Sequence, residues 1–394
     1  MRLTQLHLRN FRNYRSLDWR PGPGLTILAG GNAQGKSNLL EAIAVLVLAR
    51  SPRASADRET IAWSALAEPD PVARLVALVE RRRGPVELEV ALRALPEVAG
   101  RFDQIATAQK RVRVNGVPCR ASELVGQLNA AFFSPDDVQL VTGPPALRRR
   151  YLDMAISQVD RRYLRELQRY QRVLLQRNHL LRRVGEGAAP AAELEYWDQE
   201  LAQSGAAIVL RRRWAVGLLG PQASLLHRRL TGDVETLHLS YHEAWEQPQG
   251  ALGADAEEKA VASALRAALA ALLPREIRAG ASLLGPHRDD MVFLLDGRPL
   301  AAFGSRGQQR TAVLALKLAE ATFLEKATEE RPLVLLDDVL SELDAARREQ
   351  VLELAASLEQ AFITVSEPDS VPHRFLAQAT VVEVQSGALK PLAR

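Results

Sequence analysis

The residues with the clearest chemical potential lie in a glycine-rich stretch near the N-terminus. Residues 30–37, GGNAQGKS, fit the pattern G-x-x-x-x-G-K-[ST], between the strand-like LTILA and the helix-like SNLLEAIAVLVLA. In such a loop the backbone amides and the helix N-terminus point at a phosphate, the lysine reaches the β and γ phosphates, and the serine hydroxyl ligates Mg²⁺. We therefore predict a Walker A loop that binds ATP; the alternative is a glycine turn that only joins strand to helix. The expected nucleotide-binding residues are Gly30, Gly31, Asn32, Ala33, Gln34, Gly35, Lys36, Ser37 and Asn38.

Two adjacent aspartates supply the second half of such a site. The stretch RPLVLLDDVLSELD (331–344) contains a buried-strand run that ends in Asp337 and Asp338. Neighbouring carboxylates at a buried strand end are costly unless a cation or a water network balances them. We expect Asp337 to hold Mg²⁺ together with Ser37, and we expect Lys36 and Asp338 to act in catalysis, Asp338 on the attacking water. The alternative is a polar turn after a core strand.

Composition limits the class of protein. The chain has 394 residues, of which 47% are hydrophobic and 25% charged, and it is long enough for two or three domains. It contains no apolar run long enough to cross a membrane, its N-terminus carries charges too early for a signal peptide, and its single cysteine, Cys119, cannot pair within the chain. We therefore expect a cytoplasmic protein with no membrane partner. Only six of the 51 basic residues are lysine, and Lys36 is the only lysine among the first 109 residues, which singles out its ammonium group.

A small polar loop opens an amphipathic helix before the aspartates. The segment FGSRGQQRTAVLALKLAE (303–320) resembles, in order and spacing, the signature loop of ATP-binding cassette proteins, and SELD (341–344) is similar to their D-loop. In that family the signature of one subunit caps the γ-phosphate bound to the opposite subunit. The resemblance therefore implies that Ser305, Gly307 and Gln308 contact ATP across a pair of chains. The alternative for this loop is a helix N-cap with nothing to bind.

One part of the cassette pattern is missing. Cassette ATPases usually place a histidine just beyond the strand after the Walker B aspartates, where AFITVSEPDS (361–370) offers only Thr364 and Ser366. Asp338 also stands where a glutamate is commoner, and its carboxylate is one methylene shorter. Both departures favour slow hydrolysis, in which ATP acts as a conformational switch.

The segment between the two halves of the site is expected to be helical. From residue 143 to about 235 apolar positions recur at helical spacing, GEGAAPAAE (185–193) interrupts them, and VASALRAALAALLPREIRAG (261–280) forms a further helix. We therefore predict an α/β fold: a P-loop, ABC-type ATPase head with a mixed sheet and antiparallel N-terminal strands, and an inserted helical lobe. The predicted domains are an N-terminal ATPase half (1–143), a helical arm lobe (144–277) and a C-terminal ATPase half (278–394).

Several stretches, taken in order, resemble the RecF family, bacterial recombination and gap-repair ATPases with an SMC-like head. They are LRNFRNY (8–14), the Walker A loop, FFSPDDVQLVTGPPALRRRYLD (132–153), LLGPHRDD (283–290), SRGQQR (305–310) and LLDDVLSELD (335–344). Only the stretches around 50–125 and 235–270 lack a recognisable match. A transporter subunit or a chromosome condensin would share the Walker motifs and lack the GPHRDD and FSPDD blocks.

The resemblance implies a weak, DNA-stimulated ATPase that binds ATP, Mg²⁺ and DNA and forms a homodimer around ATP. With RecR and RecO it would promote RecA loading at junctions of single- and double-stranded DNA, in gap repair, replication and the SOS response. The resemblance also places Gln139 about where the family's Q-loop glutamine contacts Mg²⁺ or the attacking water; a surface-loop glutamine is the alternative. His287, Arg288, Asp289 and Asp290 look like a family block, for which an acid pair that caps a strand is an equal alternative to a functional contact.

Four arginine clusters are candidate contacts to DNA phosphates, with a solvated helix face or loop as the alternative. They are Arg81–Arg83, Arg148–Arg150, Arg211–Arg213 and Arg228–Arg229. No basic platform interleaved with aromatic residues is present in the sequence, so binding directed at the backbone is expected rather than base stacking. Two other classes stay open at this point: a cassette-type ATPase subunit of another machine, and a small-molecule kinase that uses the P-loop.

Overall fold

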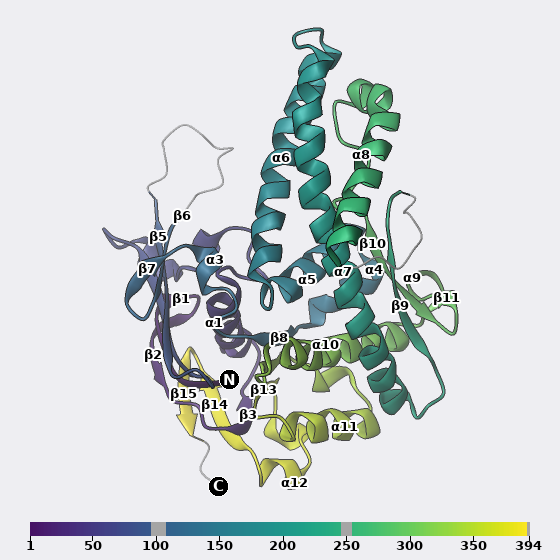
Figure 1. The fold of residues 1–394 in the computed structure, drawn as a ribbon. Coiled ribbons are helices and arrows are strands. Elements are labelled where there is room, and N and C mark those ends of the chain that lie inside the picture. Colours follow the sequence, from purple (N-terminus) through teal and green to yellow (C-terminus); the bar gives the residue numbers. More distant parts are fainter. Residues whose placement is uncertain (96–107, 246–253, 392–394) are drawn as a thin grey trace. The chain divides into compact units, whose positions relative to one another are not determined.

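The computed structural model describes residues 1–95, 108–245 and 254–391 (Figure 1). The chain divides into two compact units, each treated by itself below. The head unit consists of Met1–Asp137 with Lys317–Arg394, and the arm unit is the continuous segment Val138–Leu316. None of the helices in the described part of the chain is long and apolar enough to span a bilayer.

The N-terminal strands of the head unit form an antiparallel sheet in the order β2-β1-β4-β5-β6-β7. Along β4 the buried residues Ala73, Leu75 and Ala77 alternate with more exposed ones. One face of the sheet therefore covers the core, which is the usual arrangement for antiparallel strands. The strands are β1 (Arg2–Phe11), β2 (Tyr14–Trp19), β4 (Val72–Glu80), β5 (Val86–Ala94), β6 (Ala108–Val114) and β7 (Val117–Cys119).

A second sheet of the head unit has the order β15-β14-β3-β13-β12-β8. Its strands are β3 (Gly24–Ala29), β8 (Ala130–Phe133), β12 (Leu333–Leu336), β13 (Gln360–Val365), β14 (Thr380–Gln385) and β15 (Ala388–Pro391). The pairs from β14 to β8 are parallel and β15 is antiparallel. Every residue of β12 and β13 is buried, because both faces of a parallel sheet are covered. The predicted mixed α/β head with antiparallel N-terminal strands is confirmed.

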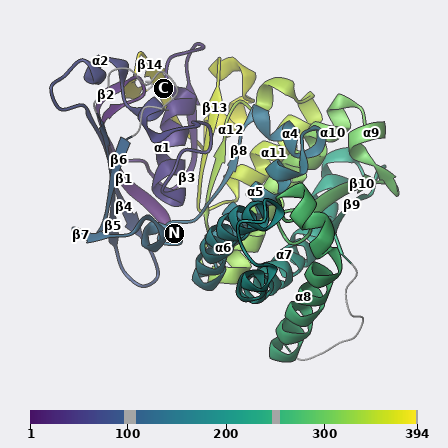
Figure 2. The ribbon, with the colours of Figure 1, turned by 90° about the horizontal axis from the view of Figure 1, so that it is seen from above.

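Helix α1 (Lys36–Leu48) lies between these two sheets (Figure 2). It contacts β4 and β5 on one side and β8 and β13 on the other. All residues from Leu39 to Val47 are buried, which explains why all of them except Glu41 are apolar. Gln360 fastens the sheets together, since its side chain accepts a hydrogen bond from the Leu3 amide at 2.8 Å and donates one to the Leu3 carbonyl at 2.9 Å. The other helices of the head unit are α2 (Trp63–Leu66), α3 (Ala121–Leu124), α11 (Ala345–Ala356) and α12 (His373–Leu376).

The arm unit is built on long helices. After the short α4 (Gln139–Thr142) come α5 (Pro145–Ser157), α6 (Arg161–Gly185), α7 (Leu194–Thr231) and α8 (Ala254–Ala279). Helices α6 and α7 form a hairpin, and α8 packs beside α7 (Figure 1). Arg177 of α6 is fully buried and donates hydrogen bonds of 2.6 Å to Asp198 of α7 and to Glu276 of α8. One guanidinium therefore joins three helices.

The arm unit also contains a three-stranded antiparallel sheet, in the order β11-β10-β9. Its strands are β9 (Leu237–His242), β10 (Asp290–Leu295) and β11 (Arg298–Pro299), and α9 (Leu300–Phe303) follows. Because β10 pairs with β9, with Met291 opposite Tyr241, residues 278–316 fold with the arm unit, whereas we expected a C-terminal ATPase half to begin at residue 278. Helix α10 (Arg306–Thr328) begins in the arm unit and ends in the head unit.

Candidate nucleotide-binding site

Seven of the nine residues predicted for the Walker A loop, 32–38, line a pocket of the head unit with a volume of about 240 Å³; Gly30 and Gly31 are not among its lining residues. The residues that line it are Asn32, Ala33, Gln34, Gly35, Lys36, Ser37, Asn38, Arg53, Asp337, Asp338, Thr364 and Ser366. The loop after β3 and the loop after β12 therefore share one site, because the carboxyl ends of parallel strands meet at the same edge of the sheet.

The backbone of the Walker A loop requires a glycine at position 35. Gly35 has φ +115°, and a Cβ there would meet the Asn13 Nδ2 atom at 2.5 Å. Asn13 donates a hydrogen bond of 2.9 Å to the Gln34 carbonyl, and the buried Tyr14 hydroxyl donates one of 3.0 Å to the Gly35 carbonyl. Two residues of the LRNFRNY stretch thus hold the loop in place through its carbonyl groups. The family resemblance of this stretch did not indicate that role.

The Lys36 ammonium lies within the loop. It donates hydrogen bonds to the carbonyls of Gly30 and Gly31, the latter at 2.8 Å. Partial burial lowers the pKa of Lys36, while the charges of Asp338 and Asp337 act in the opposite direction. Because a carbonyl is a neutral acceptor, a phosphate oxygen is a stronger partner for the same ammonium.

The Asp337 carboxylate forms the second half of the site. The hydroxyls of Ser37 and Thr364 both donate to its Oδ1 atom, at 2.8 and 2.9 Å. Asp337 is only 4% exposed, and burial raises its pKa, with the hydrogen bonds from Ser37 and Thr364 acting against that shift. Asp338 lies beside it in a left-handed conformation, φ +50°, and is exposed in the pocket. The two carboxylates thus differ in burial.

Thr364 and Ser366 occupy the place where the cassette pattern lacks its histidine. The Thr364 Oγ1 atom donates to Asp337 and accepts a hydrogen bond of 2.8 Å from the Asp338 amide. The Ser366 hydroxyl lies 3.4 Å from the Asn32 Oδ1 atom. We noted Thr364 in the sequence only as a departure, although its position at the end of a strand that neighbours β12 is the signal that assigns it to the site.

The sequence analysis did not identify Arg53, a further cationic residue at the pocket. Glu41 of α1 is fully buried and accepts two hydrogen bonds from Arg12, at 3.0 and 2.7 Å, and one from the Ser51 hydroxyl at 2.6 Å. Arg53 lies 3.8 Å from the same carboxylate and also lines the pocket. Arg53 falls in the stretch without a recognisable family match, so no motif pointed to it.

The signature residues and Gln139 belong to the arm unit. Ser305 precedes α10 and exchanges hydrogen bonds with Gln308, from the Ser305 amide to the Gln308 Oε1 atom at 2.8 Å and from the Gln308 amide to the Ser305 hydroxyl at 3.3 Å. This reciprocal pattern is that of a capping box, so the loop does cap its helix. Gly307 is open on the side where a Cβ would stand, and the Gln308 amide group donates to Glu235 at 2.7 Å. Gln139 is the first residue of α4.

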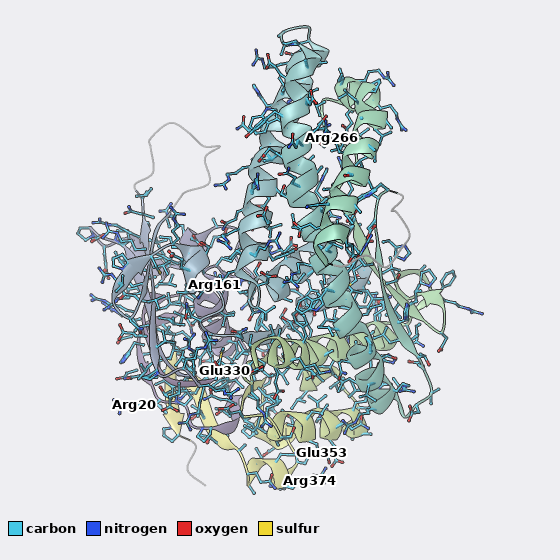
Figure 3. The ribbon with its side chains drawn as sticks, viewed as in Figure 1. Arg20, Arg161, Arg266, Glu330, Glu353 and Arg374 are labelled. Carbon is cyan, nitrogen blue, oxygen red and sulfur yellow. The ribbon has the colours of Figure 1, made fainter. Side chains whose placement is uncertain are left out.

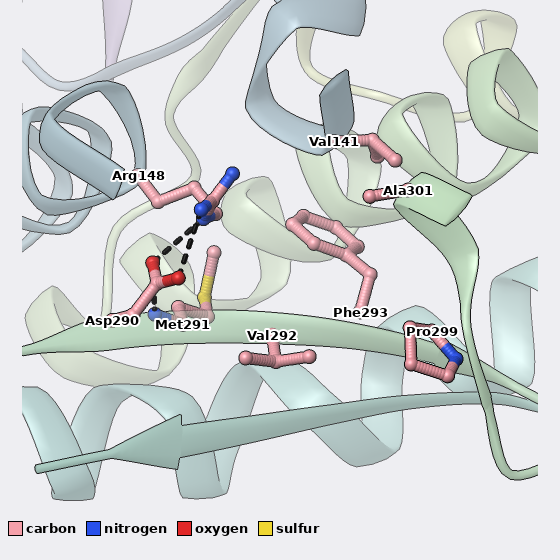
Figure 4. A pocket seen from close by; sticks show the side chains of 8 residues that line it. All are labelled: Val141, Arg148, Asp290, Met291, Val292, Phe293, Pro299 and Ala301. Carbon is pink, nitrogen blue, oxygen red and sulfur yellow. Dashed lines mark hydrogen bonds and ion pairs between the residues drawn. The ribbon is translucent and has the colours of Figure 1, made fainter. Parts of the chain in front are cut away.

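The GPHRDD block takes part in an internal network of the arm unit (Figure 4). Asp290 accepts hydrogen bonds of 2.7 and 2.8 Å from the guanidinium of Arg148, and this pair borders a hollow of about 150 Å³. Asp289 accepts hydrogen bonds from the Tyr241 hydroxyl at 2.6 Å and from the Ala244 amide at 3.0 Å. One partly buried ion pair, between Arg148 and Asp290, therefore joins the block that contains PALRRRYLD to the block that contains GPHRDD.

Two of the candidate phosphate contacts are wrong for the same reason. Arg148 is 8% exposed and Arg212 is 3% exposed. Arg212 donates to Asp153 at 2.8 Å and to the Pro286 carbonyl at 2.6 Å, and its neighbour Arg213 pairs with Glu243. The positive charge of an arginine run can be read from the sequence. The carboxylates that pair with the run in the fold cannot, because they lie far away along the chain.

The head pocket has the chemistry to bind a nucleoside triphosphate with one hard cation. An amide-rich loop and the Lys36 ammonium suit phosphates, and the oxygens of Ser37 and Asp337 suit Mg²⁺. Within the residues that the structure describes, no cluster of three or more His, Cys, Asp and Glu side chains could hold a metal alone.

A family model and several relatives match nearly the whole chain. The model described as the RecF/RecN/SMC N terminal domain matches residues 2–387. The "DNA replication and repair protein RecF" of Chloroflexus aurantiacus is 43% identical over 98% of this chain and 99% of its own length. The protein of the same name from Geobacillus thermodenitrificans is 36% identical and is covered to 99%.

Solved structures give the same assignment. The recombination mediator protein RecF with ATP, described as part of the RecFOR pathway, matches with a TM-score of 0.85 and 30% identity, over 99% of this chain and 97% of that one. An Smc head bound to the C-terminal winged-helix domain of ScpA matches with a TM-score of 0.52 at 16% identity, which shows a likeness of fold alone.

Proposed function

The chain belongs to the RecF family within the RecF/RecN/SMC group, and from this we propose that it is an ATP-dependent DNA-binding protein of recombinational gap repair and DNA replication. In this proposal two copies close around ATP, hold DNA near junctions of single and double strands in the cytoplasm, and reset by slow hydrolysis. The names of the relatives, the matched structure with ATP and the pocket of the head unit support it.

The observation that carries the proposal is the contact between Ser37 and Asp337 at 2.8 Å inside a pocket lined by the Walker A loop. Both oxygens are ligands that Mg²⁺ prefers, and the adjacent loop suits the phosphates that would complete its coordination. When bound, Mg²⁺ neutralises charge on the β and γ phosphates.

Each site residue has a proposed role. Lys36 contacts the β and γ phosphates, Ser37 and Asp337 hold the cation, and Asp338 orients or deprotonates the attacking water. Gln139 is proposed to join the cation or the water. The short Asp338 side chain and the hydroxyl of Thr364 in place of a histidine favour a weak ATPase. Its stimulation by DNA is proposed from the family resemblance alone.

The second chain is required because one chain carries one Walker A loop and one signature loop. In the proposed homodimer Ser305, Gly307 and Gln308 of one chain contact the γ-phosphate held by the other. Ser305 and the start of α10 offer a hydroxyl and helix N-terminal amides for such a contact.

The proposed partners are DNA, bound through its backbone, and RecR, with RecO and RecA acting downstream in RecA loading and the SOS response. The solved RecF that matches this chain is a recombination mediator protein of the RecFOR pathway, which supports the same partners here. The family match favours this function over a transporter subunit or a small-molecule kinase.

Molar mass in solution tests the ATP-driven dimer. The wild type is measured without nucleotide, with ADP and with ATP and Mg²⁺, beside Lys36→Met and Ser305→Arg. We expect ATP alone to double the mass and both substitutions to abolish the doubling. Glu353→Gln, an exposed residue of α11 paired with Arg374 at 3.0 Å, is the control and should dimerise like the wild type.

A wild type that binds ATP but stays monomeric would overturn the two-chain site. A Ser305→Arg variant that still dimerises would remove the signature loop from it. Stimulation of ATP hydrolysis by DNA then tests the rest of the proposal. DNA is not expected to change the hydrolysis rate of a transporter subunit or of a small-molecule kinase.

A further inference from the structure

Helix α6 of the arm unit presents one continuous exposed face. Its buried residues, among them Tyr163, Tyr170 and Arg177, lie on the opposite side of the helix. The exposed positions recur at the three- and four-residue steps of a single helical stripe. We call them the α6 stripe: Arg161, Arg165, Gln168, Arg172, Leu175, Gln176, His179, Arg182 and Arg183.

The α6 stripe carries arginines toward both of its ends. It contains five arginines and no acidic residue, and the only acid of α6, Glu166, lies 3.8 Å from Arg169. Asp160, at the start of the helix, is occupied by the amides of Arg162 and Tyr163 and by Arg211 at 2.7 Å. No carboxylate of the described residues therefore neutralises this stripe.

The stripe arginines differ from their neighbours on the same helix. Arg162 pairs with Glu258 and Arg169 with Glu200, whereas the side chains of Arg161, Arg165 and Arg172 make no hydrogen bond or ion pair within the described residues. Three guanidinium groups without a carboxylate partner on one helix face create a local positive potential that attracts an external anion.

The helix that carries the stripe is held rigidly. Besides the Arg177 links to α7 and α8, Leu180 and Leu181 pack against Leu194 of α7, with Leu273 and Ile277 of α8 beside them. Figure 3 shows Arg161 beside the lower end of α6, and Arg266 at α8. The guanidinium groups therefore project from a fixed scaffold, which reduces the ordering that binding would require.

The dimensions of the stripe match a duplex. From Arg161 to Arg183 the helix rises by about 33 Å, at 1.5 Å per residue, and one turn of duplex DNA is about 34 Å long. Duplex DNA carries about one phosphate charge per 1.7 Å of its axis, so each guanidinium on a helix of this length finds a phosphate within reach. The stripe has no Phe, Tyr or Trp side chain, and His179 is its only aromatic ring, which argues against base stacking of a single strand.

We infer that the α6 stripe is a binding surface for duplex DNA, contacted through backbone phosphates by Arg161, Arg165 and Arg172. The inference rests on the proposed function and deepens it, because it assigns the DNA contact to a helix outside the four arginine clusters of the sequence analysis. Binding through phosphates alone predicts little dependence on base sequence and a strong dependence on salt.

The test compares two triple variants of the full chain. The stripe variant is Arg161→Gln, Arg165→Gln and Arg172→Gln. The control is Lys259→Gln, Arg275→Gln and Arg278→Gln, which removes the same charge from exposed positions of α8. Affinity for a duplex of about three helical turns is measured with ATP and Mg²⁺ between about 50 and 200 mM salt. Urea unfolding confirms that both variants are as stable as the wild type, because exposed substitutions of this kind change stability little.

We expect the stripe variant to bind at least about tenfold more weakly and to reduce the slope of log K against log salt by about two to three, one for each phosphate that is no longer neutralised. The control should keep both values of the wild type. A stripe variant that matches the control, while the wild type binds duplex DNA, overturns the inference and leaves the proposed function standing. A wild type that binds no duplex under any of these conditions overturns the DNA-binding function itself.

Discussion

The Ser37 hydroxyl donates a hydrogen bond of 2.8 Å to the Asp337 carboxylate, and this contact joins residues 300 positions apart. Thr364 donates to the same oxygen atom from β13, the strand that lies between β3 and β12 in the sheet. Three chain segments thus fix one carboxylate before any nucleotide arrives, which reduces the ordering needed when the cation binds.

Asp337→Asn should separate catalysis from folding. The amide oxygen can still accept from Ser37 and Thr364, but the side chain no longer carries the charge that holds a cation. We expect hydrolysis of ATP to fall by at least about 100-fold, since a bound metal contributes several kcal/mol to such a step. The midpoint of thermal unfolding without nucleotide should not fall, because an uncompensated buried charge has been removed. A variant that unfolds well below the wild type would show that Asp337 is structural.

Gly35→Ala should impair ATP binding, and Gly31→Ala should not. A Cβ at Gly35 would meet Asn13 at 2.5 Å in a backbone with φ +115°, whereas at Gly31 the nearest atom is the Gln34 Cγ at 4.0 Å. We expect the affinity for ATP, measured by calorimetry, to fall by more than about tenfold in the first variant and by less than about threefold in the second. Equal losses in both would mean that the left-handed turn does not shape the loop.

Arg148→Met should destabilise the arm unit by about 1 to 3 kcal/mol, because it leaves the partly buried Asp290 carboxylate without its charged partner. The loss is measured by urea unfolding. Adding Asp290→Leu in the same chain removes the unpaired charge and should restore more than half of the lost free energy. If Arg148→Met instead left stability unchanged and weakened DNA binding, our correction of Arg148 would be mistaken.

His287 should make the stability of the arm unit depend on pH. The Tyr170 hydroxyl lies 2.6 Å from its Nδ1 atom and the Ser282 carbonyl 3.2 Å from its Nε2 atom. Since a carbonyl only accepts, Nε2 carries the proton and Nδ1 accepts from Tyr170, which describes a neutral ring. Burial lowers the pKa of His287 to about 4. The unfolded chain therefore binds the extra proton first, and stability falls as the pH decreases from about 6.5 toward 4.

His287→Gln tests this linkage, because glutamine can replace both hydrogen bonds without titrating. Its cost in unfolding free energy should be about 2 kcal/mol smaller at about pH 5 than at about pH 7.5. Asp289 supplies the matched comparison: burial raises its pKa to about 6, so the folded state binds its proton first and stability falls as the pH rises from about 4 to 6. Asp289→Asn should accordingly cost less at the higher pH. The same trend in both variants would contradict the assignment of either group.

The parts of the site that the sequence could predict are those written in contiguous residues. The Walker A pattern and the run before Asp337 and Asp338 each predict a strand, the turn after it and the ligand-binding side chains of that turn from a few neighbouring residues. The two turns then meet because the carboxyl ends of parallel strands lie at the same edge of a sheet. The mixed head sheet followed from the same strands. These expectations needed no knowledge of which distant segments pair.

The misassigned parts depend on long-range pairing. Arg148 was a candidate phosphate contact because its partner, Asp290, is 142 positions away. Residues 278–316 were assigned to the ATPase half because nothing local shows that β10 pairs with β9. Arg53 and Thr364 carry no motif of their own, and only the fold places them in the pocket.

The arrangement of the two units along the chain has a consequence for synthesis on the ribosome. The arm unit is one uninterrupted segment, whereas the head unit needs residues from both sides of it. During translation the arm helices can therefore pack while the second sheet of the head unit still lacks four of its six strands, β12 to β15. A nascent chain stopped before β12 would display a finished Walker A sequence with no Asp337 opposite it and would expose the apolar face of α1. Competence to bind the nucleotide productively thus arrives only when the last strands leave the exit tunnel, and an incomplete polypeptide is marked by exposed core for the chaperones and proteases of the cell.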